Sequence, residues 1–176
     1  MIEVLWHGRG GQGAFTAAKL LGAAYCMDEG AFALAFPSFG PERRGAPIRA
    51  FTKMAREPIG DRSAIEQADY VVYLDDTLLP ADPFAELKPG GTVVVNTVRE
   101  LDDPRFVAVD ADGLSQAVLG RAIPNTALLG ALSVLCGDIR RDDLAAAIRD
   151  YMPARLHEKN YQILDDAIAA VEGGLR

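Results

Sequence analysis

The stretch that decides the fold is IEVLWHGRGGQGAFTAAKLLGAA, residues Ile2 to Ala24. Its first part, Ile2–His7, is short, apolar and bounded by glycine, which is typical of a buried strand. The glycine-rich residues Gly8–Gly13 follow, and alanine and leucine then recur at helical spacing, which predicts a helix that stops at Gly30. A strand, a glycine turn and a helix in this order predict the opening of an α/β fold.

The rest of the chain predicts further strands and then a helical end. Short apolar or alternating runs predict strands at 31–36, 48–54, 68–75, 92–96 and 106–109, with a turn at Lys88–Gly91. Three helical stretches follow at 125–137, 142–152 and 157–174, with Asp142 as the expected N-cap of the second. We therefore expect one domain over residues 1–176 in three α/β/α layers, with a Rossmann-like, mainly parallel or mixed sheet covered on both faces.

Composition and charge exclude several classes of function. The 176 residues are 49% hydrophobic and 24% charged, which is typical of a globular protein. The net charge of −7 argues against nucleic acid as the main partner. No run reaches the roughly 20 apolar residues that span a bilayer, and the chain begins at once with a predicted strand instead of a signal peptide. With only two cysteines, Cys26 and Cys136, we expect a soluble protein of the reducing cytoplasm.

The glycine turn has the pattern G-x-G-x-x-G in Gly8, Gly10 and Gly13, with a predicted strand before it and a predicted helix after it. Glycines let backbone N–H groups approach a pyrophosphate, and the start of a helix adds partial positive charge. Arg9 adds a formal charge within the turn. The pattern favours a phosphate-bearing ligand, and a tight turn without a ligand is the alternative.

A nicotinamide dinucleotide is a less favoured ligand. Its ribose needs an acidic residue at the end of the second strand. Asp28 and Glu29 lie at nearly the right distance, but they precede the predicted second strand instead of ending it. The NAD(P) interpretation is therefore weakened and kept as an alternative.

The segment Pro37–Pro47, PSFGPERRGAP, contains too many prolines and glycines for a helix or a central strand. It follows a predicted strand, so we expect it at the edge of the sheet where the glycine turn emerges. Arg43 and Arg44 could pair with phosphates or with a neighbour's carboxylates, and Phe36 and Phe39 could anchor an interface. An ordinary solvated loop is the alternative.

Other polar residues are expected to have structural roles. The two histidines, His7 and His157, are far apart in the sequence, which makes a metal site improbable, and His7 is expected to be packed beside the turn. Asp75 and Asp76 end a predicted strand and are expected to cap the segment from Thr77 onward. No set of residues indicates a nucleophile, so we expect neither a catalytic side chain nor a metal.

Two motifs, HGRGGQG at 7–13 and FPSFGPERRGAP at 36–47, resemble those of the gamma subunits of 2-oxoacid:ferredoxin oxidoreductases, the pyruvate synthase group. Nearly the whole chain takes part in this resemblance, in the family's order. The further matches are Ala17, Lys19, YVVYLDDTLL at 70–79, LKPGGTVVVNT at 87–97, NTALLGA at 125–131 and Lys159-Asn160.

The resemblance implies oxidative decarboxylation of a 2-oxoacid to an acyl-CoA, with electrons passed to ferredoxin. It implies alpha, beta (thiamine-binding) and delta (ferredoxin-like) partner subunits, which carry the thiamine diphosphate, its Mg and the iron–sulfur clusters. This chain has no C-x-x-C-x-x-C run for a cluster and no G-D-G…N segment, in agreement with that division. The isolated chain is therefore expected to be inactive.

The resemblance also implies that this subunit lies over the thiamine site and helps to bind coenzyme A. The form Gly45-Ala46-Pro47 favours a pyruvate-type or branched-chain-type substrate. A stand-alone NAD(P)-binding reductase and a ligand-free scaffolding module are the alternatives from other functional classes. The residues that the resemblance implies for coenzyme A are Gly8, Arg9, Gly10, Gly11, Gln12, Gly13, Lys19, Ser38, Arg43, Arg44 and Asn125.

Overall fold

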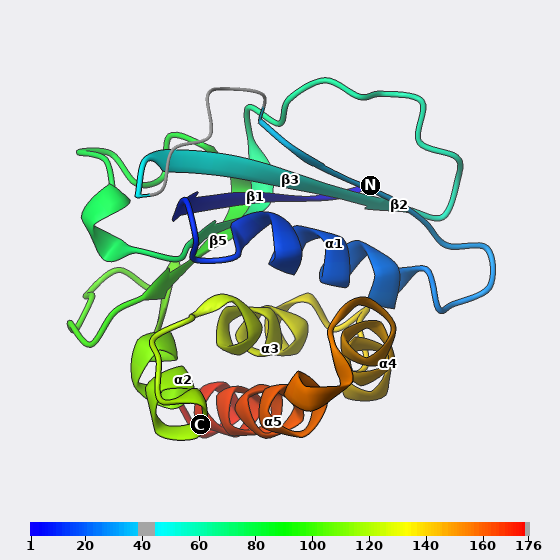
Figure 1. The fold of residues 1–176 in the computed structure, drawn as a ribbon. Helices are drawn as coiled ribbons and strands as arrows, with labels where there is room; N and C mark the ends of the chain where they lie inside the picture. Colours follow the sequence, from blue (N-terminus) through cyan, green and yellow to red (C-terminus); the bar gives the residue numbers. More distant parts are fainter. Residues whose placement is uncertain (39–44, 175–176) are drawn as a thin grey trace.

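A computed structural model describes residues 1–38 and 45–174 (Figure 1). Six strands form one sheet in the order β2-β3-β1-β4-β5-β6. The strands are β1 (Ile2–Arg9), β2 (Phe32–Pro37), β3 (Pro47–Ala55), β4 (Ala68–Tyr73), β5 (Leu87–Asn96) and β6 (Phe106–Val109). The α-helices are α1 (Ala14–Tyr25), α2 (Ala111–Leu119), α3 (Asn125–Cys136), α4 (Arg141–Tyr151) and α5 (His157–Gly174), and the 3-10 helices are η1 (Asp76–Leu78) and η2 (Ala154–Leu156).

The sheet is mixed, which confirms the predicted α/β class. β1, β4, β5 and β6 are parallel neighbours, whereas β3 pairs with β1 and with β2 in antiparallel fashion. The carboxyl ends of the four parallel strands therefore meet at one edge of the sheet. β3 separates β2 from β1, which differs from a dinucleotide-binding unit, where the second strand lies beside the first.

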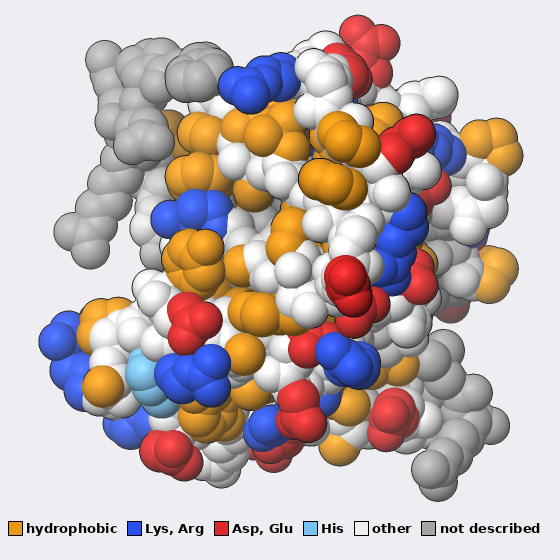
Figure 2. Space-filling model, turned by 90° about the vertical axis from the view of Figure 1, so that its right-hand side faces the viewer, with side chains coloured by type: hydrophobic (Ala, Val, Ile, Leu, Met, Phe, Trp, Pro, Cys, Tyr) orange, Lys and Arg blue, Asp and Glu red, His pale blue; other side chains and the backbone are white. Residues whose placement is uncertain are grey.

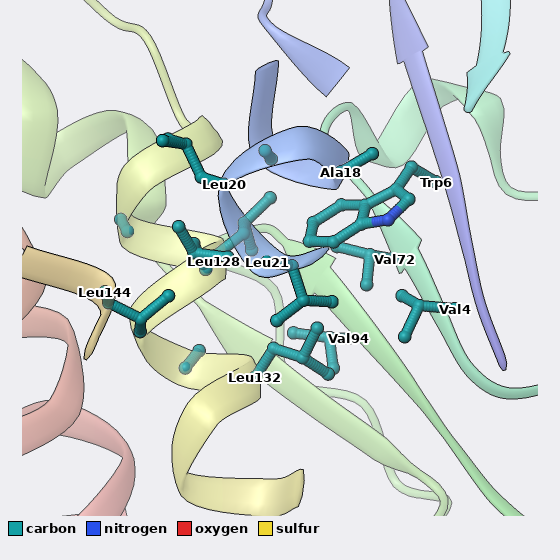
Figure 3. Packing of buried hydrophobic residues seen from close by; sticks show 14 of the residues in the cluster. Val4, Trp6, Ala18, Leu20, Leu21, Val72, Val94, Leu128, Leu132 and Leu144 are labelled. Carbon is teal, nitrogen blue, oxygen red and sulfur yellow. The ribbon is translucent and has the colours of Figure 1, made fainter. Parts of the chain in front are cut away.

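The five α-helices of the described residues lie on one face of the sheet (Figure 1). α1 packs on β1, β2 and β3, α3 packs on β5 and β6, and α4 and α5 form an outer layer behind them. In Figure 3 the side chains of Trp6, Leu21 and Leu128 gather between the sheet, α1 and α3. The molecule thus has three layers, but their order is sheet, helix, helix.

The other face of the sheet is covered by loops, which differs from the expected helices on both faces. The segments 56–67, 74–86 and 97–105, all described by the structure, connect strands without an α-helix. Because these loops carry apolar side chains, they can close a second core over the strands. That core contains Phe51, Val71 and Tyr73 from the sheet, with Ile65, Leu78, Leu79, Phe84 and Leu101 from the loops.

One local prediction was wrong because pairing along the sheet outweighed a turn signal. Lys88–Gly91 is not a turn between strands but an irregular part of β5, since Ala68 pairs with Leu87 while Tyr70 already pairs with Thr92. Gly90, with φ +83°, lies in this irregular part. Lys88 anchors it, with Nζ 2.7 Å from Asp69 Oδ2.

The helix boundaries also differ from the prediction. α1 ends at Tyr25, and Gly30 instead lies in the following turn with φ +74°. α4 begins at Arg141 after the N-cap Arg140, so Asp142 lies in the first turn and is not the cap. The predictions omitted α2, whose cap Asp110 accepts a hydrogen bond from Gly113 N at 2.8 Å.

Within residues 1–38 and 45–174, no helix is both long and apolar enough for a membrane crossing. The same residues contain no group of three or more histidine, cysteine or carboxylate side chains arranged to hold a metal ion.

Candidate functional site

The glycine turn lies at the carboxyl edge of the sheet, between β1 and α1, as predicted. Gly11 and Gly13 have φ of +100° and +85°, a backbone region that favours glycine. At Gly8 a Cβ atom would come within 3.2 Å of the Ala14 Cβ. The glycines therefore bring the start of α1 close to the end of β1.

The turn and the end of the Pro37–Pro47 segment form one hydrogen-bonded unit. Gly10 N donates to Ala46 O at 3.0 Å, and Gly45 N donates to Gly10 O at 3.2 Å. The structure thus brings together the two motifs that the sequence singled out. The predicted residues Arg43 and Arg44 lie outside the described residues.

Arg9 is held inside this unit by three hydrogen bonds. Its Nε donates to Asp75 Oδ2 at 2.9 Å, Nη1 to Gly45 O at 3.2 Å and Nη2 to Thr77 Oγ1 at 2.9 Å. Its backbone N–H donates to Gln12 Oε1 at 2.7 Å, which fixes the turn from within. Arg9, predicted as a phosphate cation, therefore makes structural contacts with three segments of the chain.

Asp75 accepts hydrogen bonds from both sides of the turn. Besides Arg9, it accepts from Gln12 Nε2 at 3.3 Å and from Thr77 N at 3.0 Å. Burial alone would raise the pKa of this carboxyl, but the hydrogen bonds from Thr77, Arg9 and Gln12 outweigh it and hold the pKa below its ordinary value. The contact with Thr77 confirms the predicted cap for Asp75, whereas Asp76 begins η1 and its carboxylate does not cap it.

Two helix N-termini meet at the turn. α1 starts after Gly13 and α3 starts after Pro124, and neither of these two residues caps its helix with a side chain, although Asn125 Oδ1 binds Thr126 N in the first turn of α3. A Cβ atom on Gly13 would come within 2.6 Å of Asn125 Nδ2, so the two helix starts are in close contact. The first N–H groups of a helix lack partners inside it and carry partial positive charge. This junction is thus suited to an anion.

Asn125 is buried, with 6% of its surface exposed, and lies against Gly13 of the turn. Its Oδ1 accepts a hydrogen bond from Thr126 N at 2.9 Å. Thr126 Oγ1 donates to Asn160 Oδ1 at 2.7 Å, and Asn160 Nδ2 donates to Leu156 O at 2.8 Å. The start of α3 is therefore anchored on α5.

An acidic cavity of about 260 Å³ lies beside the turn, and sequence reasoning missed it. The available signal was that acidic residues follow both β4 and β6, whose carboxyl ends meet. Asp76 accepts hydrogen bonds from Thr97 Oγ1 at 2.7 Å and from Arg99 Nε at 3.0 Å. The cavity is lined by Gln12, Asp75, Asp76, Asn96, Thr97, Val98, Asp110 and Asp112. Its carboxylates disfavour a phosphate on this side of the turn.

Of two further predicted residues, Lys19 lies away from the turn, whereas Ser38 lies at the same edge of the sheet, with β3 between β2 and β1. Lys19 is exposed on α1, with Nζ 5.0 Å from the centre of the Phe15 ring, and lines a separate cavity of about 280 Å³ with Cys26 and Tyr151. Figure 2 views the molecule from the side of α4 and the end of α1, where apolar side chains are gathered between charged groups. Ser38 follows β2, and its backbone N–H donates to Arg49 O at 2.8 Å.

His7 is packed, as predicted, and its ring lies on the loop-covered face. Its ring stacks on Tyr73 at a centroid distance of 4.6 Å, and its Nε2 lies 2.7 Å from Glu86 Oε2. Burial raises the pKa of Tyr73, whereas the hydrogen bond with His7 lowers the pKa of Glu86. This cluster supports the end of β1 from below the turn.

Comparisons with known proteins agree with these motifs. The model of the family "Pyruvate ferredoxin/flavodoxin oxidoreductase" matches residues 3–170. The chain is 42% identical over 182 residues to the "Pyruvate/ketoisovalerate oxidoreductases common subunit gamma" of Pyrococcus furiosus, covering 98% of each chain. It is 33% identical to the crystal structure of pyruvate oxidoreductase subunit PORC from Thermotoga maritima, with a TM-score of 0.82 over 96% of this chain and 95% of that one.

A larger solved structure contains the same fold. The 2-oxoglutarate:ferredoxin oxidoreductase of Magnetococcus marinus, with 2-oxoglutarate, coenzyme A and succinyl-CoA bound, matches 98% of this chain with a TM-score of 0.75. This chain covers 31% of that one. At 18% identity the likeness shows the fold alone.

Proposed function

The chain belongs to the pyruvate ferredoxin/flavodoxin oxidoreductase family as a gamma subunit, and we propose that it helps to bind the diphosphate of coenzyme A at the glycine turn. The observation that carries this proposal is the junction of the starts of α1 and α3 at Gly13. Backbone N–H groups at helix starts are a common site for phosphate groups in proteins. The protein does not need a buried lysine or arginine at this point, because the partial positive charges of the helix starts attract the anion.

Other phosphate contacts are proposed from the second motif. Coenzyme A carries a further phosphate on its ribose, which suits arginine side chains. Arg43 and Arg44 come directly before Gly45 in the chain, and Gly45 is hydrogen-bonded to the turn. These arginines are therefore the proposed charged partners of coenzyme A, together with the backbone of Gly10–Gly13. Lys19 lies apart from the turn and has less support, whereas Ser38 follows β2 at the same edge of the sheet as the turn.

The proposed place of this chain in the enzyme follows from the family resemblance. The resemblance implies thiamine diphosphate with its Mg on the beta subunit and iron–sulfur clusters on the delta subunit, with alpha completing the complex, and we propose the same division here. Thiamine supplies the carbanion chemistry of decarboxylation. This chain would hold coenzyme A in position for acyl transfer and help exclude water.

A pyruvate-type 2-oxoacid is the favoured substrate of the complex. The Pyrococcus furiosus relative is described as a gamma subunit common to pyruvate and ketoisovalerate oxidoreductases. A gamma subunit shared by two enzymes supports the idea that other subunits select the 2-oxoacid. Screening of 2-oxoacids with the purified complex would identify the substrate.

The test of the proposal is calorimetric titration of coenzyme A into the assembled complex that carries Gly11→Asp. Nothing lies within 4 Å of a Cβ at Gly11, so the substitution adds a negative charge at the proposed phosphate site without a clash. Two like charges at about 4 Å in a partly dry site repel strongly, and we expect a loss of affinity of at least about tenfold.

Two controls separate charge from other effects. Gly11→Ala carries the same backbone strain at φ +100° without the charge, and we expect a smaller loss of affinity. Gly60→Asp adds a carboxylate in open space elsewhere and should leave the affinity unchanged. Unchanged affinity in Gly11→Asp, with the complex intact, would favour the ligand-free scaffolding module.

The NAD(P) reductase is the less favoured alternative. β2 does not lie beside β1, and Asp28 pairs with Arg56 at 3.1 Å near the start of β2 instead of at its carboxyl end. Titration of NADH into the isolated chain tests this directly, since binding at millimolar cofactor or below would restore the alternative.

A further inference from the structure

We infer that Asp75 is a positioning residue for coenzyme A, because it holds Arg9 and Gln12 so that the glycine turn and the segment Gly45–Pro47 act as one ligand-facing unit. This inference rests on the proposed function of the turn. In this role Arg9 does not bind phosphate but holds two parts of the site together. Asp75, which follows β4, would influence the binding of the ligand without contacting it.

The carboxylate of Asp75 is fully used within the protein. Oδ2 accepts from Arg9 Nε at 2.9 Å and Gln12 Nε2 at 3.3 Å, while Oδ1 accepts from Thr77 N at 3.0 Å and Thr77 Oγ1 at 2.5 Å. An ionised carboxylate offers about four acceptor positions. Four donors therefore occupy them, and the group acts through its partners.

The guanidinium of Arg9 transmits this constraint to the second motif. Its planar fork is rigid, so fixing one edge fixes the direction of the others. Asp75 and Thr77 hold two of its nitrogens, and the third donates to Gly45 O at 3.2 Å. The pairing of Gly10 with Gly45 and Ala46 closes the same unit through the backbone.

A positioning role and simple electrostatics predict opposite changes in coenzyme A binding when the charge of Asp75 is removed. A carboxylate near an anion weakens its binding, so removing the charge of Asp75 should strengthen binding if charge alone mattered. A residue that positions the turn has the opposite effect, because N–H groups that are displaced no longer match the phosphate oxygens. The direction of the change in KM for coenzyme A therefore decides between the two roles.

The experiment uses the assembled complex and coenzyme-A-dependent viologen reduction, with KM measured for coenzyme A and for the 2-oxoacid. We expect Asp75→Asn and Arg9→Gln each to raise KM for coenzyme A about fivefold, the size expected for a partly exposed ion pair. KM for the 2-oxoacid should stay unchanged. The double variant should raise KM by less than the product of the two single effects, because both changes break the contact between Arg9 and Asp75.

Two further variants protect the test against a general loss of structure. Thr77→Val removes the Oγ1 that accepts from Arg9 and should raise KM for coenzyme A by a smaller factor. Asp165→Asn changes a carboxylate on α5 that pairs with Arg141, away from the turn, and should leave KM for coenzyme A unchanged. Thermal unfolding of each complex shows whether the subunit remains folded.

The outcomes distinguish this inference from the proposed function. A KM for coenzyme A that falls or stays within about twofold in Asp75→Asn, or a double variant with additive effects, would overturn the positioning role. If Gly11→Asp weakens coenzyme A binding while Asp75→Asn does not, only the inference fails. If neither variant changes it, the proposed function fails as well.

Discussion

The two faces of the sheet differ in what covers them and in the forces that hold the cover. On the helix-covered face, buried side chains such as Trp6 and Leu128 pack against α1 and α3. On the loop-covered face, loops supply fewer apolar side chains, and Lys53 and His7 are tied to acidic residues instead. One face thus depends on close packing, whereas the other adds charges that respond to pH and salt.

The largest difference between the two faces should appear in the free energy of unfolding when a core side chain is truncated. Leu128 is completely buried between α3 and the sheet, and Leu128→Ala should lower the free energy of unfolding by about 3 kcal/mol. Leu79→Ala, in a partly buried loop position, should cost about 1 kcal/mol. Urea denaturation measures both, and equal costs would show that the two faces contribute alike.

Changes to the ion pair of the buried Lys53 should have smaller effects on stability, and the order of two variants is informative. Its Nζ lies 2.5 Å from Asp61 Oδ2 and 3.7 Å from Glu3 Oε1, with 1% of the side chain exposed. Asp61→Asn removes a partner from a buried ammonium, whereas Lys53→Met removes the buried charge itself. We therefore expect a lower urea midpoint for Asp61→Asn than for Lys53→Met. The reverse order would mean that this pair contributes little to the loop cover.

Glu86 should give the smallest effect, visible as pH dependence. The hydrogen bond with His7 holds its pKa below the ordinary value in the folded chain. A carboxyl with a lowered folded-state pKa stabilises the fold above its unfolded pKa, and this contribution is lost as the pH falls below about 4.3. The wild-type melting temperature should exceed that of Glu86→Gln near neutral pH, and the gap should close in acid. A gap that persists in acid would assign the effect to packing.

Local sequence patterns predicted the turn but not all of its contacts. Gly8–Gly13 could be interpreted correctly because strand, turn and helix are adjacent in the chain. The strand order could not be predicted in this way, because β3 inserts between β2 and β1 through pairing that no local pattern records. Lys88–Gly91 was assigned as a turn for the same reason. These residues belong to β5 because β5 pairs with β4, and that pairing is not visible in the local sequence.

The role of Arg9 shows the same limit within the site. A positive charge in a glycine turn indicates a phosphate partner when only neighbours in sequence are considered. Its partners Asp75 and Thr77 follow β4, far along the chain, and they become visible only when β1 and β4 pair. Asn125 shows this limit again: no local pattern indicates that this residue lies against Gly13, because the contact forms only when the start of α3 packs on the turn, and its predicted role toward coenzyme A stays a prediction.

The contact of Gly13 with Asn125 has a consequence for synthesis on the ribosome. The glycine turn is among the first segments to emerge, but the side chain that packs on it belongs to α3, and α3 is anchored by Asn160 on α5. A nascent chain that ends before these helices would carry the turn without its second helix start. The proposed anion site would therefore be completed late in translation, when both helix starts and their support on α5 have been synthesised.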